Sequence, residues 1–139
     1  MKNSILYLFL LLLFGVNLFG QNVLPKPTSY LSVVDETATL TAAENEALTK
    51  KLDAFKDATS HELVIVLVQS LNGSDVESYA NTLFNNWGIG KKGKDNGVLL
   101  LVAINDRKMR IETGYGVEAV LTDAEAARVL DELLTPHFK

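Results

Sequence analysis

The chain has 139 residues, with 13 Lys and Arg against 17 Asp and Glu and a formal net charge of −4. This length suits one domain, and the mild acidity predicts neither a nucleic-acid partner nor much attraction to anionic lipid. The chain has no cysteine, so disulfides, thiolate nucleophiles and thiolate metal sites are excluded.

Residues 1–20 have the pattern of a secretory signal peptide. Lys2 supplies a basic start, Ile5 to Phe19 are almost all apolar, and Gly20 is a small residue before Gln21. The alternative is an N-terminal membrane anchor, but about 15 apolar residues fall short of the roughly 20 that a spanning helix needs. We therefore expect an exported protein, periplasmic or extracellular, with no membrane span after signal cleavage.

The segment 21–29 contains two prolines and little hydrophobic pattern, so it is predicted to be an extended linker before a domain at 30–139. Residues 30–34 suit a short edge strand. Three hydroxyl residues, Thr41, Ser74 and Thr122, are each followed three positions later by glutamate, which is the pattern of a capping box at a helix start. Apolar residues then recur at helical spacing through 42–58, through 75–87, and from Ala126 until Pro136 ends the third helix.

Two continuous apolar runs, 63–68 and 98–104, are typical of strands that are covered on both faces. Residues 109–113 alternate between apolar and charged, which places this strand at or near a sheet edge, and 105–108 form a plausible hairpin connection. The helix at 75–87 would join two parallel strands, and the hairpin would add an antiparallel one. The sequence thus predicts an α/β fold, a three-layer α/β/α sandwich with a mixed central sheet of about four strands flanked by helices.

The run from Gly88 to Gly93 matches the dinucleotide fingerprint G-x-G-x-x-G. Such a loop binds phosphate when it leaves a strand and enters a helix, because it then aims free helix amides at the anion. Here the order is reversed, so no nucleotide is expected. His61 and His137 lack the spacing of a zinc helix, and no serine lies in a strand-to-helix elbow; no catalytic residue is predicted.

Acidic and amide side chains gather instead in loops that the topology can bring together. Antiparallel pairing places the loop before 98–104 and the loop after 109–113 at the same sheet end, and Asp35 could join them if it follows a strand running alongside. Carboxylate and amide oxygens are the ligands that Ca²⁺ and Mg²⁺ prefer. The predicted metal ligands are Asp35, Asp95, Asn96 and Glu118, and the predicted ligand or partner loop comprises Gly93, Lys94, Gly97, Gly114, Tyr115 and Gly116. The alternative is that these polar residues make turn hydrogen bonds, end a strand or are solvated.

Other loop residues leave two interpretations open. Tyr115, between two glycines, could expose its ring to a partner or fold it back over the sheet edge. Arg107 and Arg110 could hold an anion or pair with nearby acids.

Three runs in this order, WGIGKKGKDNGVLLLVA, DRKMRIETGYGVE and LTDAEAARVL, resemble the TPM domain family over approximately residues 30–139. The resemblance implies an extracytoplasmic α/β/α domain that is auxiliary to a membrane or envelope complex, as in thylakoid-lumen proteins of photosystem repair and a modulator of an acetylcholine receptor. Some members bind calcium or magnesium at loops on one sheet end, and acid phosphatase activity is ascribed to a plant member. Matching positions here would be Asp95, Asn96 and 114–118, with Asp35, and a further helix would be expected after Lys139.

Three functions follow as hypotheses. The prediction is an exported domain that binds a divalent cation and serves a membrane or envelope protein partner. The second is a metal-assisted phosphatase, in which the cation would polarise a phosphoryl oxygen while Arg107 or a lysine of 91–94 offsets its charge. The third is a structural interaction module without metal.

Overall fold

The computed structural model describes residues 20–29 and 31–137, so the predicted signal segment lies, apart from Gly20, outside the described residues. At its centre is a four-stranded sheet in the order β1-β2-β3-β4. Its strands are β1 (Val33–Asp35), β2 (Glu62–Val68), β3 (Gly97–Ala103) and β4 (Lys108–Thr113). β1–β2 and β2–β3 pair in parallel and β3–β4 pair antiparallel, which confirms the predicted mixed sheet with edge strands at both sides.

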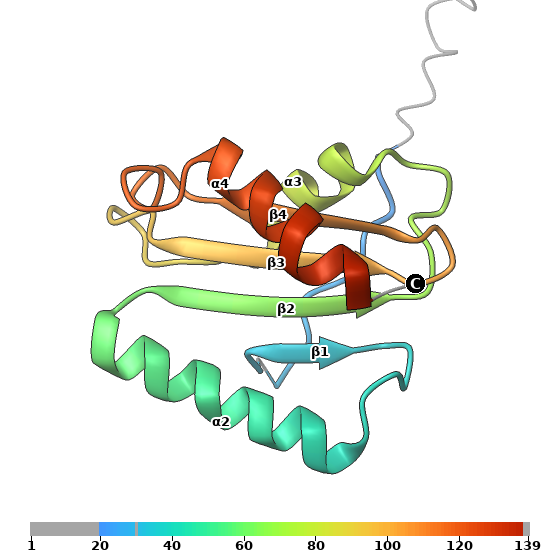
Figure 1. Ribbon diagram of the computed structural model, residues 1–139, viewed down its shortest axis with the longest axis horizontal. Helices are drawn as coiled ribbons and strands as arrows, with labels where there is room; N and C mark the ends of the chain where they lie inside the picture. Colours follow the sequence, from blue (N-terminus) through green and yellow to red (C-terminus); the bar gives the residue numbers. More distant parts are fainter. Residues whose placement is uncertain (1–19, 30, 138–139) are drawn as a thin grey trace, which may run out of the picture.

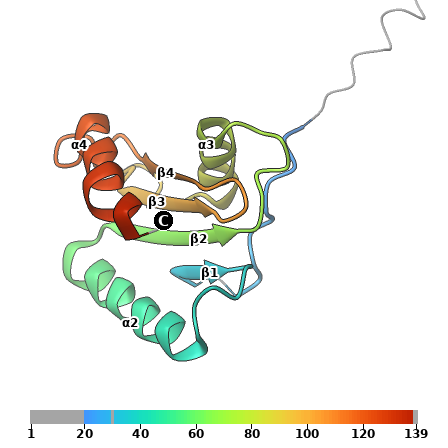
Figure 2. The same cartoon turned by 45° about the vertical axis from the view of Figure 1, so that its right-hand side comes forward.

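The helices form two layers around this sheet. They are α2 (Ala42–Thr59), α3 (Val76–Trp87) and α4 (Asp123–Arg128). α3 covers one face, while α2 and α4 lie on the other, so the predicted α/β/α sandwich is confirmed (Figures 1 and 2). None of the helices in the described part of the chain combines the length and the apolarity that a membrane crossing requires.

The main hydrophobic core lies between α3 and the sheet, because alternate side chains of β2 and β3 point to that helix. Its largest fully buried members include Trp87, Leu83, Leu99 and Leu101. The opposite face is covered less completely: α2 has no buried residue, and Leu100 stays partly exposed. The continuous apolar runs of β2 and β3 thus correspond to strands with helices on both faces, as expected.

Two of the three predicted helix N-caps are confirmed. Thr41 and Thr122 form complete capping boxes with their glutamates. The predicted cap at Ser74 is wrong, because Asp75 is the N-cap and its carboxylate accepts from the backbone N–H of Ser78 at 2.7 Å. A carboxylate accepts more strongly than a hydroxyl and interacts favourably with the helix dipole, and these hydrogen bonds hold the pKa of Asp75 below its ordinary value.

The third helix ends differently from the prediction. It is α-helical only to Arg128 and continues as a π-helix over Val129–Leu134 and a short 3₁₀ turn over Thr135–His137. The backbone N–H and the hydroxyl of Thr135 both donate to the carbonyl of Leu130, five residues earlier. Because the wider turn rotates the apolar stripe, Leu133 is 61% exposed.

The segment predicted as an extended linker has no helix or strand, and it packs along α3. We call residues 21–26 the N-terminal strap. The N–H of Leu24 donates to the Tyr79 hydroxyl at 3.1 Å, and the Trp87 indole donates to the Leu24 carbonyl at 2.9 Å. Val23 and Leu24 also pack against the main core, and Lys26 donates to the Trp87 carbonyl at 2.6 Å. The strap therefore belongs to the folded body.

Candidate functional site

Two loops that are distant in the chain meet where β3 begins and β4 ends. The N–H of Gly114 donates to the Gly97 carbonyl at 2.9 Å, and the N–H of Gly116 donates to the Asp95 carbonyl at 2.8 Å. Figure 1 shows both loops at the left-hand end of the sheet. The predicted convergence of 93–97 with 114–118 is thereby confirmed.

Glycine is required where the loops touch. A Cβ atom on Gly116 would overlap the Lys94 carbonyl oxygen, and one on Gly114 would overlap that of Asp95. The Gly-Tyr-Gly sequence thus serves a close backbone contact. Tyr115 is 82% exposed, so its ring is presented to solvent and does not fold back over the sheet edge.

The loop before β3 is hydrogen-bonded to the buried carboxylate of Glu62. Glu62, which is 8% exposed, accepts from the Lys56 ammonium at 2.8 Å and from the backbone N–H of Gly90 at 2.5 Å. This arrangement links the end of α2, the start of β2 and the glycine-rich loop. This role of Glu62 was not predicted, because nothing in the neighbouring sequence distinguishes Glu62 from a solvated acid.

Asn96 has a structural role in the same loop. It is 5% exposed, its side-chain oxygen accepts from the backbone N–H of Lys91 at 2.8 Å, and its side-chain NH₂ donates to the Ser60 carbonyl. The alternative interpretation, turn hydrogen bonding, therefore describes Asn96 better than cation binding. We remove it from the candidate ligands.

Asp95 and Glu118 line one cavity of about 320 Å³ between α3, the end of β4 and the two loops. We call it the acidic cavity. Its remaining lining residues are Asn81, Phe84, Asn85, Ile89, Glu112, Thr113, Gly114 and Tyr115. Within the described part of the chain, no hydrogen bond or ion pair engages the carboxylate of Asp95 or Glu118. Both groups are therefore free to bind a ligand.

Three polar members of the cavity were missed by the sequence prediction. Glu112 accepts from the Asn81 amide at 3.2 Å and pairs with Arg110 at 3.4 Å, while the Asn85 amide donates to the Asn81 side-chain oxygen at 3.1 Å. The four-residue spacing of the asparagines on one helix and the alternation of β4 were available signals. Of the two interpretations left open for Arg110, pairing with a nearby acid is therefore the one observed.

Asp35 does not join this site, which corrects the prediction. β1 runs parallel to β2, and Asp35 pairs with Leu67 near the end of that strand, whereas Asp95 precedes the start of β3. Its carboxylate accepts from the N–H and hydroxyl of Thr37 at 2.8 and 2.5 Å and from the N–H of Leu40 at 2.8 Å. Burial opposes ionisation of Asp35, but these hydrogen bonds outweigh it and hold its pKa below the ordinary value.

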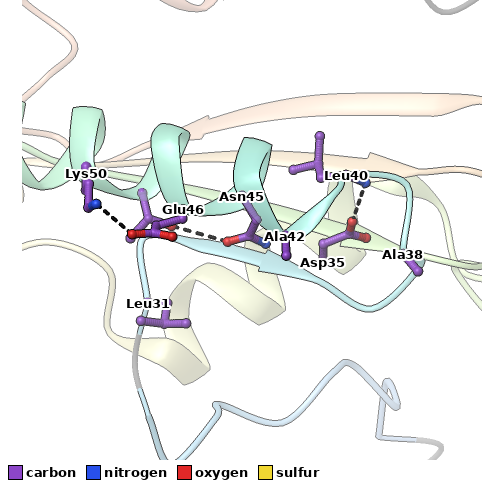
Figure 3. A pocket seen from close by; sticks show the side chains of 9 residues that line it. Leu31, Asp35, Ala38, Leu40, Ala42, Asn45, Glu46 and Lys50 are labelled. Atoms are coloured by element: carbon purple, nitrogen blue, oxygen red, sulfur yellow. Dashed lines mark hydrogen bonds and ion pairs between the residues drawn. The ribbon is translucent and has the colours of Figure 1, made fainter.

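The surroundings of Asp35 offer no alternative site. Figure 3 shows its carboxylate directed at Leu40 beside a shallow hollow of about 610 Å³ along the first turns of α2. The charged pair in this hollow, Lys50 with Glu46 at 2.6 Å, is highly exposed. Such an exposed ion pair contributes little binding energy.

The chemistry available in the acidic cavity is that of hard oxygen donors. Across residues 20–29 and 31–137, no three Asp, Glu or His side chains are grouped as a preformed metal site. The free carboxylates of Asp95 and Glu118 instead suit a hydrated cation, because Mg²⁺ in particular keeps several waters and binds through one or two carboxylates. Arg107, considered as an anion partner, lies in the β3–β4 turn at the opposite end of the sheet.

Comparison with known proteins identifies the family. The model of the TPM domain matches residues 33–139. The solved N-terminal domain of a P. gingivalis protein is 32% identical in sequence, with a TM-score of 0.72 over 77% of this chain and 68% of that one.

A second solved structure, the N-terminal domain of a Corynebacterium glutamicum protein, is 21% identical with a TM-score of 0.57 over the same shares and supports the fold alone. No curated protein matches the chain. The match of the family model, together with the fold and the meeting of the two loops, shows that the chain belongs to the TPM domain family.

Proposed function

We propose that this chain is an exported domain that binds a divalent cation in the acidic cavity and serves a membrane or envelope protein partner. The observation that carries the proposal is the convergence on one cavity of Asp95, from the loop before β3, with Glu112 and Glu118, from the end of β4 and the loop after it. TPM domains are generally extracytoplasmic, which supports export. Because Tyr115 is 82% exposed beside the cavity, this end of the sheet is accessible from outside the domain.

The residues fit a weakly held, hydrated ion. Asp95 and Glu118 would bind it directly or through water, and Asn81 also lines the cavity. Glu112 would contribute less, because Arg110 already neutralises part of its charge. Without a cage of several carboxylates, we expect a dissociation constant of about 10⁻⁴ to 10⁻³ M, the range of extracellular Ca²⁺ modules.

A titration with Ca²⁺, and separately with Mg²⁺, followed by backbone amide NMR tests this proposal. We expect saturable shifts confined to 93–97, 112–118 and the side-chain amides of Asn81 and Asn85. The double variant Asp95→Asn/Glu118→Gln should abolish them, and asparagine suits position 95 because the backbone there has a φ of 46°.

The matched control is Asp123→Asn/Glu132→Gln, which removes two exposed acids outside the cavity and should leave the shifts intact. Shifts that are small and uniform, or that persist in Asp95→Asn/Glu118→Gln, would refute the cation proposal. The hypothesis of an interaction module without metal would then be the better one.

The phosphatase hypothesis has less support from the geometry. Arg107 lies at the opposite end of the sheet and Arg110 is paired with Glu112. Among the described residues, this leaves the lysines of 91–94, in the loop that contains Asp95, to offset phosphate charge. No observation in the described residues favours turnover over binding.

A further inference from the structure

The loop between α3 and β3 carries a concentrated positive charge. Lys91, Lys92 and Lys94 are exposed, and no acid in the described part of the chain forms an ion pair with any of them. Asp95 is the one acid of the loop, and its side chain lines the acidic cavity. Although the chain has a formal net charge of −4, this loop at one end of the sheet is therefore locally basic.

Two exposed apolar side chains lie on the neighbouring loop. Tyr115 is 82% exposed and Val120 is 71% exposed. Their loop is held against the loop of Lys91, Lys92 and Lys94 by the hydrogen bond from the Gly116 N–H to the Asp95 carbonyl. Within it, the N–H of Val120 donates to the Val117 carbonyl at 2.9 Å. Figure 1 shows the two loops projecting together from one end of the sheet. We call Lys91, Lys92, Lys94, Tyr115 and Val120 the basic rim.

We propose that the basic rim docks on an anionic lipid surface. Clustered lysines are attracted to anionic headgroups, tyrosine prefers the headgroup level, and a small aliphatic side chain can insert at the acyl boundary. The inference goes beyond the cation proposal and does not require a bound ion.

The composition of the rim favours lipid over an acidic protein. Protein–protein interfaces are enriched in Arg and depleted in Lys, and their aromatic anchors fill pockets. Here all three basic residues are lysines and the aromatic ring protrudes into solvent. A fluid, negatively charged surface needs no matching pocket, so it suits these flexible side chains.

The expected strength follows from the number of charges. One lysine near an anionic membrane raises the partition coefficient about fivefold, so three independent lysines would raise it about 100-fold. Asp95 and Glu118 oppose this attraction from the adjacent cavity. We therefore expect removal of the three lysine charges to weaken vesicle binding by at least about tenfold.

A reporter at the rim gives the sharpest test, because the chain has no cysteine. Ala119→Cys in the full chain, labelled with an environment-sensitive fluorophore, places the reporter at an exposed position next to Val120. It is mixed with vesicles of phosphatidylcholine, with or without phosphatidylglycerol, in the presence of EDTA. A second reporter, Asn105→Cys, lies in the β3–β4 turn at the opposite end of the sheet. Because the signal arises at the rim, attachment of the chain elsewhere does not produce it.

The decisive comparison is between two variants of equal net charge. Lys91→Gln/Lys92→Gln/Lys94→Gln removes the rim charges, whereas Lys50→Gln/Lys51→Gln/Lys108→Gln removes three exposed lysines elsewhere. We expect a blue shift of the Ala119→Cys reporter, but not of the Asn105→Cys reporter, on phosphatidylglycerol vesicles. High salt, or the substitution Lys91→Gln/Lys92→Gln/Lys94→Gln, should weaken vesicle binding measured by this shift at least about tenfold. The control Lys50→Gln/Lys51→Gln/Lys108→Gln should leave vesicle binding unchanged.

Three outcomes would overturn the proposal. These are no shift at the rim on anionic vesicles, an equal shift on neutral vesicles, or an equal loss in both triple variants. The first would leave an acidic protein as the better partner for the rim. Since EDTA is present throughout, failure of this experiment is independent of whether the acidic cavity binds a cation.

Discussion

Gly116→Ala tests the loop contact on which the candidate site depends. Gly116 does not use the left-handed backbone region, so alanine brings no intrinsic strain there. Its methyl group would, however, overlap the carbonyl oxygens of Lys94 and Asp95. The substitution therefore acts through the approach of the two loops alone.

The magnitude can be worked out from three contributions. Forcing a methyl group into a close-packed contact costs about 1–3 kcal/mol, and weakening the 2.8 Å hydrogen bond from Gly116 to Asp95 costs about 1 kcal/mol. The lower entropy of the unfolded chain offsets about 0.4–1 kcal/mol. We expect the free energy of unfolding to fall by about 1–4 kcal/mol.

Urea denaturation measures this change as a lower midpoint at constant m-value, and amide NMR locates it. Resonances of 93–97 and 114–118 should move, while those of the α2 region stay. The control is Gly93→Ala, which has a φ of 85° and open space around it. It should cost about 1–2 kcal/mol through its left-handed backbone without moving 114–118. If Gly116→Ala kept the wild-type stability and the Asp95 resonance, the loops would not be in contact and the composite site would be refuted.

Three further predictions concern the strap, a helix cap and acid stability. Tyr79→Phe removes the hydroxyl that accepts from the Leu24 N–H; stability should fall by about 1 kcal/mol and amide exchange at Leu24 should accelerate, whereas unchanged exchange would mean that the strap is not docked. Asp75→Ala should lower Tm in a thermal melt while Ser74→Ala should not, because the carboxylate is the cap; the opposite order would contradict that assignment. The pKa of Asp35 is depressed on folding, so its stabilising effect is present above the ordinary value of 3.8 and is lost as pH falls through the folded value. Asp35→Asn should therefore flatten the acid side of a stability–pH profile, and an unchanged acid limb would show that its hydrogen bonds contribute nothing.

The parts of the fold that were predictable are those with a strong local pattern. The apolar runs of β2 and β3 are typical of covered strands, and the spacing of Val76, Tyr79 and Leu83 indicates an amphipathic helix with one buried face. The meeting of the loop before β3 with the loop after β4 followed from the hairpin alone, because an antiparallel pair brings its outer ends together. Local sequence therefore sufficed for the position of Asp95 and Glu118.

The errors arose where the outcome depended on non-local competition. Ser74 and Asp75 are adjacent, both can cap a helix, and only the geometry of the entering chain decides between them. Asp35 was misplaced because the direction of a three-residue strand is not encoded in that strand; the crossover through α2 makes it parallel to β2. Glu112 was missed because its partner Asn81 lies on α3, 31 residues earlier in the chain.

The acidic cavity and the basic rim share one loop, and this predicts an interaction between them. Lys94 is followed directly by Asp95, so the cavity carboxylates oppose the attraction of the rim to anionic lipid. A cation that neutralises them should strengthen vesicle binding several-fold, and by thermodynamic linkage vesicles should strengthen cation binding by the same factor. Vesicle titrations with EDTA or Ca²⁺ measure this coupling.

The variant Asp95→Asn/Glu118→Gln gives the control for this coupling. With both carboxylates neutral, vesicle binding in EDTA should already exceed that of the unmodified chain, and Ca²⁺ should add little. If Ca²⁺ increased vesicle binding equally in the variant and in the unmodified chain, the ion would be acting on the lipid and not through the cavity. The two sites would then be electrostatically independent, although Asp95 and Lys94 are neighbours in the chain.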